Sequence, residues 1–173
     1  MHKALRFLPL IVVLALVVIF SLPLLQHKDA KIISSVLIGR AMPETVLSAQ
    51  DLDHRVALVN FFASWCVSCT AEQQELQKIA KEKKISIFGI AYKDKPDALK
   101  KWLSVHGNPF KKIAMDNDGR AGIDWGVSGV PETFVVDAAG IVRYRHVGPV
   151  TAESFAREIA PVLETLATEG GTK

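Results

Sequence analysis

The chain has 173 residues, a length typical of one domain; 49% of them are hydrophobic and 23% are charged. This composition excludes a disordered or low-complexity chain, and two cysteines are too few for a disulfide-rich scaffold. The net charge of +3 arises in the first 31 residues, which hold four of the 21 basic residues and one of the 18 acidic ones. The remainder is neutral, which argues against nucleic-acid binding.

Residues 8–25 form an apolar run of 18 residues without a charge, close to the roughly 20 that a helix needs to cross a bilayer. Lys3 and Arg6 precede the run, so the positive-inside rule predicts a cytoplasmic segment over residues 1–7 and export of the rest. The alternative is a cleaved signal peptide, whose apolar part usually spans about 7–15 residues. The longer run, with no small-x-small pattern after it, favours an uncleaved transmembrane anchor.

A polar stalk over residues 26–35 is expected to follow the anchor, and residues 36–173 are expected to form the folded domain. Whether the apolar run is an anchor or a signal peptide, this domain lies outside the cytoplasm. Disulfide chemistry is not suppressed there by the glutathione pool. The two cysteines can therefore form a disulfide.

The domain begins with a strand–helix–strand pattern. Residues 56–62 and 85–91 are continuous apolar runs of strand length, typical of strands buried on both faces. Residues 66–83 have helical spacing, which predicts a parallel pair with a right-handed crossover. The apolar stripe of this helix is expected from Leu76, Ile79 and Ala80, with the polar residues Glu72, Gln73 and Gln74 facing elsewhere.

Further helices and strands follow. In order, we expect a helix over 96–106, a strand near 111–115, a short helix near 119–125, a hairpin of strands 133–136 and 141–146, and a helix from Thr151. Pro161 is expected to kink or break that last helix because proline has no N–H to donate. The order predicts a thioredoxin-like α/β fold, a central mixed sheet flanked by helices.

The motif Trp65-Cys66-Val67-Ser68-Cys69 stands between the first strand and its helix. A CxxC at a helix N-terminus brings two sulfurs within bonding distance and exposes the first. Unpaired backbone N–H groups and the helix dipole favour the thiolate, which lowers the pKa of Cys66. Cys66 is then the attacking nucleophile, and Cys69 is the resolving thiol.

Other uses of two cysteines are less well supported. A zinc site needs two more ligands, and His54, His106 and His146 lack the spacing for it. Covalent haem needs CxxCH, whereas Thr70 follows the second cysteine. A purely structural disulfide of this spacing closes so short a loop that it stabilises little. A copper-binding or apocytochrome-binding chaperone remains an alternative, for which Met115 and His106 are the candidate additional ligands.

Several segments together resemble one family: LVNFFASWCVSCTAE, AYKDKPDALKKWL, HGNPF, DNDG and GVSGVPETFVVDAAGIVRYRHVGPV. From about residue 36 to 168 the chain resembles the DsbE/CcmG thiol:disulfide interchange proteins of cytochrome c maturation. The resemblance implies an inner-membrane protein whose domain faces the periplasm. It implies a reductant of apocytochrome c or of a partner thiol protein, itself re-reduced by an integral-membrane thiol reductant. No metal, nucleotide or haem cofactor is implied. A general periplasmic disulfide reductase is the alternative within the same chemistry.

The resemblance also assigns residues next to the motif. Pro131, after Val130, matches the proline that is cis in thioredoxin-like folds and lies against the CxxC. Glu132 matches an acidic residue beside the active site, where a carboxylate opposes thiolate formation and can move a proton. Trp65 is expected to be part of the contact surface.

Asn60 stands six residues before Cys66, where ordinary thioredoxins have a buried aspartate. The acid/base function is therefore expected from Glu132 or from Glu72, which lies one helical turn after Cys69. A surface position for Glu72 is the alternative. Val67 and Ser68, between the cysteines, lack the proline that is common in relatives, so they leave the redox potential open.

Overall fold

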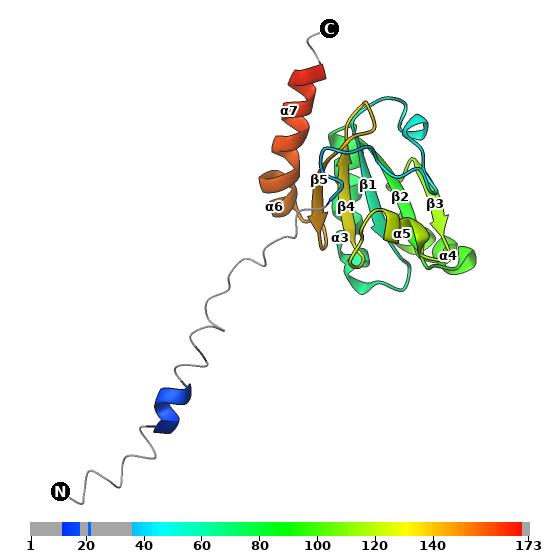
Figure 1. Ribbon diagram of the computed structural model, residues 1–173. Helices are drawn as coiled ribbons and strands as arrows, with labels where there is room; N and C mark the ends of the chain where they lie inside the picture. The colour runs from blue at the N-terminus through cyan, green and yellow to red at the C-terminus, as the bar shows by residue number, and fades with distance from the viewer. Residues whose placement is uncertain (1–11, 18–20, 22–35, 171–173) are drawn as a thin grey trace, which may run out of the picture. The chain divides into compact units, whose positions relative to one another are not determined.

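A computed structural model describes residues 12–17, 21 and 36–170 (Figure 1). The chain divides into two compact units, residues 1–33 and 34–173. Residues 12–17 of the first unit are helical. In the described part of the chain, no helix is long and apolar enough to cross a membrane. The predicted segment 1–7, the stalk and most of the predicted anchor lie outside the described residues.

The second unit is built on a five-stranded mixed sheet of order β3-β2-β1-β4-β5 (Figure 1). β1 to β3 are parallel, and β4 and β5 are antiparallel to their neighbours. The strands are β1 (Ala57–Phe62), β2 (Ser86–Tyr92), β3 (Lys112–Asp116), β4 (Glu132–Val136) and β5 (Val142–Val147). The apolar runs of β1 and β2 are strands buried on both faces, as the sequence predicts.

Helices connect the strands and cover both faces. They are η1 (Ala49–Leu52), α3 (Val67–Glu82), α4 (Pro96–His106), α5 (Arg120–Asp124), α6 (Ala152–Ser154), the π-helical η2 (Phe155–Ile159) and α7 (Ala160–Gly170). Residues of α3, α4, η2 and α7 share one buried apolar cluster with the sheet, and residues of η1 and α5 share the other. The β1–α3–β2 and β2–α4–β3 connections step across the sheet in the same direction, and the common handedness of such connections places both helices on one face. The expected thioredoxin-like arrangement is confirmed.

The C-terminal helix continues through Pro161 instead of breaking there. Residues 155–159 form a π-helical turn, in which the Ala160 N–H donates to the Phe155 carbonyl five residues back. A π-helical turn changes the hydrogen-bond register ahead of the proline, which has no N–H of its own to donate. Of the two predicted outcomes, a kink or a break, the break was therefore wrong, and the irregularity lies in the π-helical turn just before Pro161. Phe155 and Ile159 are both buried in the core.

The predicted orientation of α3 was wrong in one respect. Glu72 and Gln73 are each only 1% exposed and lie among the core positions of the helix, whereas Gln74 is exposed. Gln73 is satisfied there because its side-chain N–H donates to the Gly107 carbonyl at 2.7 Å, at the end of α4. The buried face of α3 is thus partly polar, and Glu72 is its polar residue nearest to the cysteines.

Candidate active site

Cys66 and Cys69 form a disulfide where β1 passes into α3. Cys66 is the N-cap of α3, and its sulfur accepts a hydrogen bond from the Cys69 N–H at 3.1 Å. The sulfur thus occupies the position of an anion at a helix N-terminus. It is less exposed than the sequence suggests, since Cys66 is 6% exposed and Cys69 is 1% exposed. Cys66 is still the more accessible of the two.

The turn before the disulfide is held by the segment after β2. Asp94 accepts hydrogen bonds from the Ser64 N–H at 2.5 Å and from the Ser64 hydroxyl at 2.8 Å. The indole N–H of Trp65 donates to the Lys93 carbonyl at 3.2 Å, while the side chain remains exposed. Sequence reasoning gave Asp94 no role, because its partner lies 30 residues away in another loop.

The loop before β4 lies against the first sulfur. The Val130–Pro131 peptide bond is cis, the form that the family resemblance implies. Antiparallel pairing places Glu132 opposite Phe61, so Pro131 lies next to the end of β1 and to the turn that leads into the cysteines. The Val130 carbonyl oxygen is 3.6 Å from the Cys66 sulfur. The loop thereby covers the sulfur and limits its exposure.

Glu72 is buried one helical turn beyond Cys69, on the same face of α3. Its carboxylate accepts hydrogen bonds from the Asn60 side-chain N–H at 3.0 Å and from the Val150 backbone N–H at 2.8 Å. Burial raises the pKa of Glu72 from 4.5 to about 7, and these two hydrogen bonds oppose the rise only in part. The group therefore exchanges protons near neutral pH. Its burial removes the surface alternative.

Asn60 connects Glu72 to the sheet. Its side-chain N–H also donates to the Thr133 hydroxyl at 3.0 Å, across the β1–β4 pair. The side-chain carbonyl of Asn60 has no hydrogen-bond partner among the described residues. Asn60 thus turns an N–H donor toward the Glu72 carboxylate, and a hydrogen bond of this kind stabilises the ionised form of Glu72.

Glu132 has a different environment from Glu72. It is fully buried and forms an ion pair with Arg145, with an Oε2–Nε distance of 2.7 Å and an Oε1–Nη2 distance of 2.9 Å. As the neighbour of Thr133 along β4, it points to the opposite face of the sheet from Asn60 and Glu72. Ser128 and Gly129 also donate to its Oε1. These contacts make Glu132 the anchor of a loop.

Nothing in the described part of the chain gathers three or more His, Cys, Asp or Glu side chains into a group that could hold a metal ion. His146, one of the isolated histidines, lies on β5 with its Nδ1 2.9 Å from Glu158. The residues that do lie close together are at one end of β1: the two cysteines, Pro131 and Glu72.

Residues 28–161 match the Redoxin family. The chain is 37% identical over 184 residues to the thiol:disulfide interchange protein DsbE of Vibrio cholerae, covering 98% of each chain. It is also 37% identical over 173 residues to the thiol:disulfide interchange protein HelX of Rhodobacter capsulatus, covering 94% of this chain and 97% of that one. The chain belongs to the DsbE/CcmG family. With its CxxC pair, this member is a thiol:disulfide oxidoreductase.

Solved structures agree on the fold. The crystal structure of a Chlorobium tepidum protein described as DsbE has a TM-score of 0.61 and 24% sequence identity, covering 73% of this chain and 97% of that one. At that identity the similarity shows the fold alone. The family and its thiol chemistry come from the sequence relatives, and the placement of the site residues comes from the contacts above.

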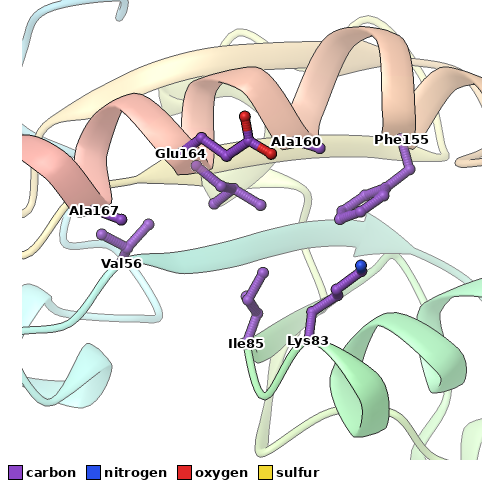
Figure 2. Close-up of a pocket in the computed structure, with 8 residues that line it drawn as sticks. Val56, Lys83, Ile85, Phe155, Ala160, Glu164 and Ala167 are labelled. Atoms are coloured by element: carbon purple, nitrogen blue, oxygen red, sulfur yellow. The ribbon is translucent and has the colours of Figure 1, made fainter.

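A pocket of about 330 Å³ lies at the other end of the sheet (Figure 2). Val56 and Ile85, just before β1 and β2, line it on the side of the sheet. In Figure 2, Val56 lies beside Ala167, and the Phe155 ring lies over Lys83. Since Cys66 follows the far end of β1, the pocket and the disulfide lie at opposite ends of the parallel strands. The pocket is therefore separate from the site around the disulfide.

Proposed function

We propose that this oxidoreductase is a membrane-anchored, periplasmic reductant in cytochrome c maturation, with the disulfide of an apocytochrome c or of a partner thiol protein as its substrate. The observation that carries the proposal is the Cys66–Cys69 pair at the N-terminus of α3, with the buried Glu72 one turn further along. The family resemblance over most of the domain supplies the reducing direction and the substrate class.

The reaction begins with the reduced pair. The Cys66 thiolate, stabilised at the helix N-terminus, attacks one sulfur of the substrate disulfide and releases the other as a thiolate, which takes up a proton. Cys69 then loses its proton to the Glu72 carboxylate and attacks the Cys66 sulfur. The mixed disulfide breaks, the substrate leaves as a dithiol, and the Cys66–Cys69 disulfide forms.

Glu72 suits this second step because its pKa of about 7 lets it accept a proton near neutral pH and give it back on re-reduction. The Cys66–Cys69 disulfide would be re-reduced by an integral-membrane thiol reductant. Trp65 and Val67 are exposed beside Cys66 and would contact the substrate chain.

The equilibrium potential of the Cys66–Cys69 pair against a glutathione series tests the direction of electron flow. A value below about −180 mV is expected for a dedicated reductant, whereas a value near −120 mV, as in a strong oxidant, would refute the reducing role. The substrate class is tested by a Cys69→Ser variant with an oxidised CxxCH peptide. We expect a stable mixed disulfide through Cys66, and none with Cys66→Ser as the matched control.

The anchor over residues 8–25 and the periplasmic position of residues 36–173 are part of the same proposal. They rest on the uncharged run and on the basic residues Lys3 and Arg6 before it. We expect the chain to stay in the membrane fraction with its N-terminus intact, and its domain to be digested by protease added to spheroplasts. Recovery of a shortened chain in the soluble periplasmic fraction would instead support a cleaved signal peptide.

A further inference from the structure

The ion pair between Glu132 and Arg145 has a position that stability alone does not explain. Glu132 is fully buried, and the side chain of Arg145 is 9% exposed. Two buried charges lose their hydration, so such a pair adds little net stability compared with apolar side chains of the same size. The pair is therefore better explained by the part of the chain that it positions.

The pair holds the loop that leads to Pro131. Oε1 of Glu132 accepts hydrogen bonds from the Ser128 N–H at 2.9 Å, the Ser128 hydroxyl at 2.6 Å and the Gly129 N–H at 3.3 Å. Nη2 of Arg145 reaches the Ser128 hydroxyl at 3.3 Å as well. The loop is thus tied both to the carboxylate on β4 and to the guanidinium on β5.

Arg145 is itself fixed. Its guanidinium carbon is 6.0 Å from the centre of the Phe134 ring, which is fully buried in the core on that face of the sheet. At the end of the same strand, the Gly148 N–H donates to the Pro131 carbonyl at 3.0 Å. β5 therefore sets the position of the loop from both sides of Pro131.

The loop in turn lies over the reacting sulfur, because the Val130 carbonyl oxygen is 3.6 Å from the Cys66 sulfur. The loop is therefore next to the sulfur that a substrate disulfide has to reach. We propose that Arg145 is a positioning residue, which acts through Glu132 and Ser128 to hold residues 128–130 where a polypeptide disulfide aligns with Cys66. The inference rests on the thiol–disulfide exchange proposed above and extends it to recognition of the substrate backbone.

The chain offers a matched control on the same strand. Arg143, two residues earlier on β5, forms an ion pair with Asp137 at 2.6 Å. Asp137 likewise accepts backbone hydrogen bonds, from Ala139 and Ile141 at 2.9 Å each, but in the β4–β5 hairpin at the end of the sheet away from Cys66. Arg143→Met therefore removes the same kind of contact without touching the loop over the sulfur.

The experiment compares two substrates with the reduced full-length chain in detergent. One is an oxidised CxxC peptide, and the other is a small aromatic disulfide that needs no chain alignment. We expect Arg145→Met to slow exchange with the peptide by about tenfold and to change the rate with the small disulfide by less than about twofold. Arg143→Met should change neither rate. Arg145→Lys, which restores the charge, should recover part of the peptide rate.

Arg145→Met leaves Glu132 buried without its cation, so Ser128→Ala is a milder second variant that removes only the hydroxyl contacts. It should also slow the peptide more than the small disulfide. Equal slowing with both substrates in the two variants would overturn the proposal, as would equal effects of the Arg145 and Arg143 variants. A wild-type chain that reduces the small disulfide but not the peptide would refute the proposed reduction of polypeptides. A chain inert toward both would refute the exchange reaction itself, and in either case the positioning role falls.

Discussion

Glu72→Gln should change how the stability of this protein depends on pH. In the folded protein the pKa of Glu72 is raised from 4.5 to about 7, because the carboxyl is buried. Between these pH values the folded state binds a proton that the unfolded state has released. The free energy of unfolding therefore falls as pH rises from about 4.5 to about 7 and is level above that.

A shift from 4.5 to about 7 corresponds to about 3 kcal/mol, at roughly 1.4 kcal/mol for each pH unit. Glutamine has the shape of glutamate but carries no charge, so it removes this loss. Its carbonyl can still accept from the Val150 N–H. Its amide stands where Oε1 accepts from the Asn60 N–H, so the Asn60 side-chain amide must turn over; the glutamine can then donate to the Asn60 carbonyl, which has no partner among the described residues of the wild-type protein. We expect the variant to be more stable than wild type by up to about 3 kcal/mol at pH 8, with little difference at pH 4.

Urea unfolding of the oxidised protein at a series of pH values measures this difference. Glu82→Gln is the control, because Glu82 is an exposed residue at the end of the same helix. That variant should keep the full decline of wild type. If the curves of Glu72→Gln and wild type run parallel from pH 4 to pH 8, the buried carboxyl does not titrate near neutrality, and its role as the proton acceptor for Cys69 is lost with it.

Two further predictions concern packing and the turn before the cysteines. Gly89→Ala should destabilise the fold by about 1–3 kcal/mol, because the new Cβ would lie 2.7 Å from the Phe62 ring. Gly129→Ala is the control, since its Cβ would stand in open space, and it should lower the free energy of unfolding by less than about 0.5 kcal/mol. Urea unfolding of both variants measures the difference. Asp94→Asn should lower the unfolding free energy by about 1–2 kcal/mol, since it weakens charge-assisted hydrogen bonds to Ser64, and an unchanged urea midpoint would refute that role.

Much of the fold could be predicted from the sequence, because the features that indicate its strands and turns are local. The buried runs of β1 and β2, and the glycine and proline residues between elements, placed the strands to within one or two residues. The CxxC motif could be placed at a helix N-terminus for the same reason. The π-helical turn before Pro161 could not be predicted, because such a turn depends on how the last helix packs, which the helical spacing does not specify.

The burial of Glu72 could have been predicted from the sequence, but the pattern that indicates it was overlooked. Cys69, Glu72, Leu76 and Ile79 recur at helical spacing, so a carboxyl stands in the apolar stripe itself. By contrast, Asp94 and its partner Ser64 come from loops 30 residues apart. Such pairs follow from the order of the strands, and no local pattern in a single sequence encodes them.

The two acidic residues that the family resemblance places beside the cysteines differ in their hydrogen-bond partners. Among the described residues the hydrogen-bond donors to Glu72 are neutral, Asn60 and Val150, so its charge is costly and its proton is exchangeable near pH 7. Glu132 has the guanidinium of Arg145 against both of its oxygens and lies on the other face of the sheet. Both oxygens of Glu132 are thus engaged, by a cation and by loop N–H groups. The two carboxylates near the disulfide therefore differ in kind: Glu72 is buried among neutral donors with a raised pKa, whereas Glu132 is paired with a cation and holds the loop before Pro131.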